Sequence, residues 1–265
     1  MMRGTFFQLL VRGLLAGLIA GLLAGAVAFV VGEPHIESAI ALEEAAAEAE
    51  PHDHGTATGH DRDTAAAAEA GHSHSHGDDA LVGRTGQKIG LFLATTLAGV
   101  ALGAIYASVL HFARRLTDMP GWKLGLFGAA GAWLAVDAVP FAKYPANPPA
   151  VGDPDTINER TLLWLASVVL GLVAIAVAVA VSKALAGQEL YTVRIAGPLL
   201  AFLVVVGLGY LVLPSIDEVG EGFPATLLWD FRVASFTVQL TLWAALGLAF
   251  AYLTERASRH TLVSA

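Results

Sequence analysis

The stretch GLLAGLIAGLLAGAVAFVV, residues 13–31, contains no charged side chain. About twenty consecutive apolar residues in an α-helix cross the ~30 Å hydrocarbon core of a bilayer. In lipid the backbone must satisfy its own hydrogen bonds, and an α-helix does so within one segment. This stretch therefore predicts a transmembrane helix near the amino terminus.

Five further apolar stretches of similar length follow it, at residues 89–110, 124–141, 162–181, 195–213 and 234–253. The composition agrees with a lipid environment, because 55% of the residues are apolar and 14% are charged, with a mean hydropathy of +0.63. In soluble domains roughly a quarter of the residues are charged. We expect an all-α fold, a polytopic membrane helix bundle with about six transmembrane helices.

Three regions follow from this reading. Residues 1–31 hold the first transmembrane helix, residues 32–88 form an acidic, histidine-rich extracytoplasmic loop, and residues 89–265 form a membrane domain with five further helices. Six spans put both termini on one side. With cytoplasmic termini, nine of the fifteen basic residues lie inside, which agrees with the positive-inside rule. We expect a multi-pass protein of the cell inner (cytoplasmic) membrane.

The first segment has an alternative interpretation, a cleaved signal peptide. Arg3 and Arg12 precede the apolar run, and Ala26–Ala28 is similar to a signal-peptidase site. The run is long for a signal peptide, and glycine recurs at every fourth residue, at Gly13, Gly17, Gly21 and Gly25. Such a stripe allows close helix approach in lipid. Packing within the chain is the favoured reading, with a groove for a separate partner helix as the alternative.

The loop after the first span is unusually acidic and rich in histidine. Twelve of the twenty-three carboxylates lie between Glu33 and Asp79. Its alanine, glycine and acid content cannot build a core, so we expect a helix over residues 34–50 and then a disordered tail. Six histidines lie close together in that tail: His52, His54, His60, His72, His74 and His76.

Clustered imidazoles with adjacent carboxylates bind first-row divalent metal ions, with affinity rising toward nickel and copper. We expect this tail to capture metal and raise its local concentration without selecting one ion. The alternative is a solvated loop whose histidines are incidental. On the preceding helix, Glu33, Glu37 and Glu44 fall on one stripe as further candidate ligands. His35 points to the opposite side, so it belongs to a different site, or the helix is broken at Gly32.

Asp137 lies inside the third predicted span, where a charged group is costly unless it is paired or hydrated. It is the best single candidate for a ligand along an ion path. Pro140 follows one turn later and is expected to weaken the helix, which frees backbone carbonyls. The alternative is a structural role in which Asp137 pairs with Lys143 or Arg160.

The loop after this span contains four prolines in ten residues and is expected to be stiff. Asp153 followed by Pro154 predicts a helix cap, with Thr156 and Glu159 as a competing capping box. Near the start of the last span, Asp230 and Arg232 are expected to pair.

Several of these motifs together resemble the CbtA family of probable cobalt transporter subunits. They are Gly32–Pro34, Glu43–Glu44, Tyr144–Pro149, Asp153–Pro154 and Trp229–Arg232. The resemblance extends over nearly the whole chain and implies cobalt uptake for cobalamin synthesis, with Co²⁺ as the transported ion. It also implies a small single-span CbtB-like membrane subunit as partner. The family is usually described with five spans, whereas we count six.

The chain has no cysteine, which excludes disulfides and thiolate ligands. It contains no P-loop, H-E-x-x-H or G-x-S-x-G pattern, so ATP binding through a P-loop and hydrolase chemistry have little support. We expect a non-enzymatic protein with no cofactor and no nucleic-acid partner, whose partners are the lipid bilayer and a divalent metal ion. A nickel or zinc permease and a non-transporting metal-binding scaffold or sensor stay open as alternatives.

Overall fold

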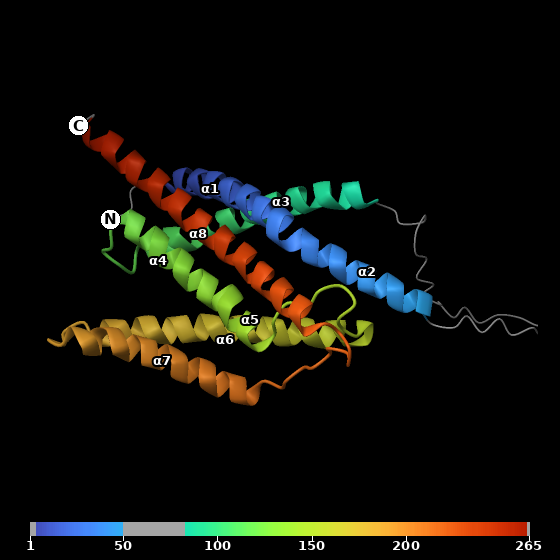
Figure 1. Cartoon of the computed structure of the whole chain (residues 1–265). Helices are drawn as coiled ribbons and strands as arrows, with labels where there is room; N and C mark the ends of the chain where they lie inside the picture. Colours follow the sequence, from blue (N-terminus) through green and yellow to red (C-terminus); the bar gives the residue numbers. More distant parts are fainter. Residues whose placement is uncertain (1–3, 50–82, 264–265) are drawn as a thin grey trace, which may run out of the picture.

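The structure, a computed structural model, describes residues 4–49 and 83–263, with side chains for residues 4–46 and 83–259. The described residues form helices and no strand (Figure 1). The α-helices are α1 (Phe6–Val27), α2 (Glu33–Ala49), α3 (Arg84–Ala113), α4 (Gly121–Trp133), α5 (Val139–Lys143), α6 (Ile157–Ala184), α7 (Tyr191–Val212) and α8 (Ala225–Val263). Short π-helical segments, η1 (Ala28–Gly32) and η2 (Leu134–Ala138), join some of them, and η3 (Pro154–Thr156) is a 3₁₀ turn before α6.

Six helical stretches in the described chain are long and apolar enough to cross a membrane. They are Phe6–Ala46, Arg84–Ala113, Gly121–Lys143, Pro154–Ala184, Tyr191–Val212 and Ala225–Arg259. Each predicted span lies within one of these stretches, except that the predicted span 195–213 runs one residue past Val212. The expected all-α bundle with six candidate spans is therefore confirmed for this part of the chain.

The spans alternate in direction, so the bundle has two distinct ends (Figure 1). The start of α1 and the last turns of α8 lie at one, which we call the terminal end, together with loops 114–120 and 185–190. The opposite end, called the loop end, carries loops 144–156 and 213–224. The last turn of α2 and the first turn of α3, which flank residues 50–82, also lie there.

The first span continues into α2 without a break, through η1. The stretch Phe6–Ala46 has 41 residues, which is roughly 60 Å of helix at about 1.5 Å per residue and twice the thickness of the hydrocarbon core. Part of this helix must therefore lie outside the lipid, and α2 extends from the loop end (Figure 1). The helix predicted to begin at Pro34 is present, and it is not broken at Gly32.

The glycine stripe of α1 packs against α3 inside the chain. A Cβ atom at Gly17 would overlap the carbonyl oxygen of Gly99, and one at Gly13 would overlap that of Gly103. Because the glycines have no side chain, the two antiparallel helices approach to backbone contact. The favoured reading of the stripe is confirmed, since this face of α1 is already occupied by α3.

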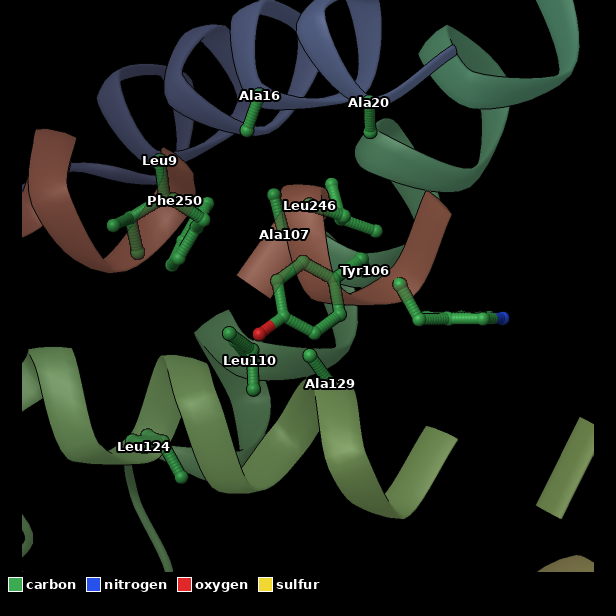
Figure 2. Packing of buried hydrophobic residues seen from close by; sticks show 11 residues of the cluster. Leu9, Ala16, Ala20, Tyr106, Ala107, Leu110, Leu124, Ala129, Leu246 and Phe250 are labelled. Atoms are coloured by element: carbon green, nitrogen blue, oxygen red, sulfur yellow. The ribbon is translucent and has the colours of Figure 1, made fainter. Parts of the chain in front are cut away.

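The largest apolar cluster lies between α1, α3, α4 and α8 (Figure 2). The ring of Tyr106 stands at its centre, close to Leu110 and Leu246 (Figure 2), and its hydroxyl donates to the carbonyl oxygen of Gly125. Phe250 closes the cluster toward the terminal end. Tyr106 thus joins α3 to both α4 and α8.

The α6–α7 pair joins this core through η2 and α5 (Figure 1). A smaller cluster of Val139, Ala174 and Val206 lies at the junction. The Tyr210 hydroxyl on α7 donates to the carbonyl oxygen of Val139. The η2–α5 segment is therefore in contact with helices on both sides.

Candidate functional site

Asp137 lies in η2, partly buried between this segment and α8. Its Oδ2 atom accepts a hydrogen bond from the indole Nε1–H of Trp243, a buried side chain on α8. No hydrogen bond to its Oδ1 atom is found among the described residues. The Asp137 side chain is thus held in place by a neutral donor, and no basic side chain bonds to it in the described structure.

The predicted structural partners of Asp137 bind elsewhere. Lys143 donates from Nζ to the Tyr210 carbonyl oxygen and to Ser215 Oγ, each at 3.3 Å. Arg160 forms an ion pair with Glu218, with 2.8 Å between its Nη1 atom and Oε2. The alternative that paired Asp137 with Lys143 or Arg160 is therefore wrong, because α8 and not the loop end supplies the partner.

Aromatic rings align this part of α8 with the segment that carries Asp137. The Phe236 ring lies 5.5 Å from that of Trp133 and 5.4 Å from that of Phe141, measured between centroids. The stretch 236–243 of α8 therefore runs along residues 133–141. Asp137 lies at the middle of this interface.

Two further polar atoms in the interface have no partner. Gln239 Oε1 on α8 and Trp133 Nε1 on α4 are both buried and make no hydrogen bond in the described structure. Gln239 lies one helical turn from Trp243, and Trp133 lies one turn from Asp137, so both pairs share a helix face. Sequence reasoning missed Gln239, although an amide within a predicted span that has no charged residue was a visible signal.

The backbone of η2 is disturbed next to Pro140, where weakening was expected. The Val139 amide donates to the Leu134 carbonyl oxygen, five residues back. In a regular α-helix the Val139 amide would donate to the Ala135 carbonyl, but here it is bonded to Leu134. The next residue, Pro140, has no N–H group to replace it, so the Ala135 carbonyl lacks a backbone amide donor. This carbonyl faces α6, where a Cβ atom at Gly171 would overlap it. Asp137 and the open carbonyl therefore lie on different sides of η2.

The proline-rich loop at the loop end is held by α8. Arg232 donates from Nε to the Ala146 carbonyl oxygen at 3.3 Å and from Nη2 to Asn147 Oδ1 at 3.0 Å. The expected pair of Asp230 and Arg232 is absent from the described structure, because the guanidinium points into this loop. Two of the sequence motifs, Tyr144–Pro149 and Trp229–Arg232, are thus in direct contact.

The predicted cap after this loop is present. Asp153 Oδ1 accepts from the Asp155 amide at 2.9 Å, ahead of Pro154 at the first position of η3. The competing capping box is not formed, because the Thr156 hydroxyl lies within hydrogen-bond distance of two other acceptors, the Asp153 carbonyl oxygen and Glu218 Oε1. Asp153 therefore caps the helix, as expected from the sequence.

A pocket of about 640 Å³ opens between this loop, α6 and loop 213–224. Arg160, Glu218 and Arg232 line it together with Tyr144 and Trp164. Burial raises the pKa of the Tyr144 hydroxyl, and the nearby charge of Glu159 raises it further. The hydroxyl therefore stays protonated and donates to the Pro214 carbonyl oxygen at 2.8 Å.

A second recess of about 670 Å³ lies between α2, the proline-rich loop and loop 213–224. Glu43 of α2 and Glu221 of loop 213–224 both line it. The recess lies near the end of α2, where the chain enters the histidine-rich segment.

Two of the candidate ligands on α2 are paired with basic side chains of α3. Glu33 and Glu37 face α3, where Glu33 lies 2.5 Å from Arg84 and Glu37 lies 2.6 Å from Lys88. These two carboxylates are therefore neutralised by basic side chains at the root of the histidine-rich segment.

His35 is partly exposed and Glu44 is exposed on the same helix. The histidines at 52, 54, 60, 72, 74 and 76 lie outside the described residues. Within the described residues, no three His, Asp or Glu side chains are arranged to hold a metal ion. Metal binding by these candidates thus stays a prediction.

Comparison with known proteins gives one match. The family model described as "Probable cobalt transporter subunit (CbtA)" matches residues 6–255, which includes the first five candidate spans and most of the sixth. Searches of curated proteins and of solved structures gave no match. Since the family model covers almost the whole chain, this multi-pass membrane protein belongs to the CbtA family of probable cobalt transporter subunits.

Proposed function

We propose that this subunit forms the path by which a cobalt importer passes divalent metal through the membrane, in the service of cobalamin synthesis. The observation that carries the proposal is the environment of Asp137. Its carboxylate lies within the bundle and is bonded to the Trp243 indole. A buried charge without a counterion is costly, and a passing cation would offset that cost.

Metal capture is assigned to the loop end. The histidine-rich segment leaves the bundle there, between α2 and α3, and clustered imidazoles raise the local concentration of divalent ions. The recess with Glu43 and Glu221 lies on the way from that segment to the bundle. Glu33, Glu37, Glu44 and His35 belong to this capture surface in the proposal, and metal there competes with Arg84 and Lys88 for the two glutamates.

The loop end faces outward in this proposal, and both termini are cytoplasmic, as the distribution of basic residues favours. An inside-negative membrane potential then drives cation entry, by about 2.3 kcal/mol per charge per 100 mV. The family description as a subunit implies at least one partner, and we assign that role to a small single-span CbtB-like protein.

Uptake of radioactive cobalt into cells tests this function. Cells that express the chain with its small partner should accumulate cobalt above cells with an empty vector, and excess unlabelled cobalt should reduce the signal more than nickel or zinc. Cobalt bound at the cell surface without accumulation inside would instead support the scaffold or sensor. Stronger competition by nickel or zinc would support a permease for that metal.

A further inference from the structure

We propose that Gln239 is a second oxygen ligand beside Asp137, and that the two hold a partly hydrated divalent cation between η2 and α8. This inference deepens the proposed function and rests on it. The interface contains a buried acceptor atom without a donor, Gln239 Oε1, and the Asp137 carboxylate, whose Oδ2 atom accepts from Trp243.

The register of the helices brings the two residues together. Phe236, three residues before Gln239, packs between Trp133 and Phe141. Trp243, four residues after Gln239, bonds to Asp137. Gln239 is therefore bracketed by contacts to the same segment, and its position on α8 faces η2.

The free atoms are of the kind that a hydrated cation requires. Buried polar atoms without partners cost about 1–3 kcal/mol each, so such atoms mark a place that another group fills. Amide and carboxylate oxygens are hard ligands for divalent cations. With two protein oxygens the ion keeps water molecules, which complete its coordination.

Two protein ligands make a weak site, which suits passage. Conduction requires binding that is favourable enough for entry and weak enough for release. A complete cage of buried ligands would retain the ion. The pair of Asp137 and Gln239 therefore acts as a transfer point and not as a storage site.

Cobalt titration of the purified full-length chain in lipid nanodiscs tests this assignment. The six loop histidines between His52 and His76 are replaced by serine, so that they do not mask the weaker site. Co²⁺ quenches nearby tryptophan fluorescence, and Trp133 and Trp243 border the site. The difference in quenching between this chain and its Asp137→Asn variant reports how far the proposed site is occupied by Co²⁺.

Gln239→Leu should weaken this Asp137-dependent affinity by about tenfold or more, and Gln239→Glu should strengthen it by about tenfold, as expected for bonds to a charged group. Thr241→Val is the matched control, because that hydroxyl bonds to its own helix at the Thr237 carbonyl oxygen, and it should leave the affinity unchanged. The melting temperature without metal should not fall in Gln239→Leu, since the substitution removes an unpartnered acceptor.

Three results would overturn the assignment. Unchanged affinity in both Gln239 variants, with binding lost in Asp137→Asn, would remove Gln239 and leave the proposed function intact. A lower melting temperature in Gln239→Leu with unchanged cobalt affinity would make the amide a structural group. Absence of any Asp137-dependent cobalt signal, although the chain imports cobalt in cells, would mean that water alone fills the interface.

Discussion

The indole N–H of Trp243 on α8 donates to the Oδ2 atom of Asp137 in η2, and this bond links two helices in the interior of the bundle. The two residues are 106 positions apart in the chain. An indole fixes the orientation of a carboxylate without neutralising it. This relationship gives Asp137 a defined position without a basic partner, which is what the proposed ligand on an ion path needs.

Replacement of Trp243 by phenylalanine should leave the Asp137 carboxylate without its donor. We expect a loss of about 1–3 kcal/mol in stability, because a buried acceptor then lacks a partner. Thermal unfolding of the detergent-purified protein measures the change. Trp164→Phe on α6 is the matched control, since that side chain is 43% exposed. Equal melting temperatures for the two variants would contradict the role of the indole.

A single methyl group at Gly17 should disrupt the contact between α1 and α3. The Cβ atom of Gly17→Ala would overlap the carbonyl oxygen of Gly99, and overpacking of this kind costs about 1–3 kcal/mol. Gly90→Ala, on α3 itself, is the control, because a Cβ atom there meets nothing within 4 Å. Thermal unfolding should separate the two variants, and similar stability would show that the helices are not in backbone contact.

The span positions could be predicted from the sequence because hydrocarbon thickness sets helix length. The glycine stripe at Gly13 and Gly17 also predicted its own close packing. The continuous helix through Gly32 was harder to foresee, since glycine and proline together favour a break. The π segment η1 absorbs Pro34 without ending the helix, and such local adjustments leave no pattern in the sequence.

The candidate site was only half visible from the sequence. Asp137 could be identified because ionisable side chains are rare within membrane spans and are usually paired or functional. Its partner Trp243 could not, because indoles are common in membrane spans and the pairing depends on the register between two distant helices. The same register makes Gln239 a candidate and gives Arg232 a partner in the proline-rich loop.

Cysteine accessibility should establish the orientation of the bundle. The chain has no native cysteine, so Ser73→Cys and Thr117→Cys give single reporters for the histidine-rich segment and for loop 114–120. In cells whose cytoplasmic membrane is intact, we expect a membrane-impermeant thiol reagent to label position 73 and to spare position 117. Labelling of position 117 alone would reverse the orientation and place the histidine-rich segment inside.

Deletion of residues 51–79 should reduce cobalt uptake at limiting metal and leave the maximal rate nearly unchanged. A capture segment changes the local concentration of the ion and not its passage through the bundle. Uptake measured across a range of cobalt concentrations separates the two effects, with the protein level in the membrane as the control. Loss of uptake at saturating cobalt would assign this segment to the path itself.

The most direct test of the path is cobalt uptake by Asp137→Asn in cells that also express the small partner subunit. The amide keeps the shape of the side chain and can still accept from Trp243, but it removes the charge. The account predicts that uptake is lost while the protein level in the membrane is kept, and that Asp118→Asn, in an exposed loop at the terminal end, imports cobalt normally. Uptake by Asp137→Asn at the rate of the unmodified chain would contradict a path through Asp137.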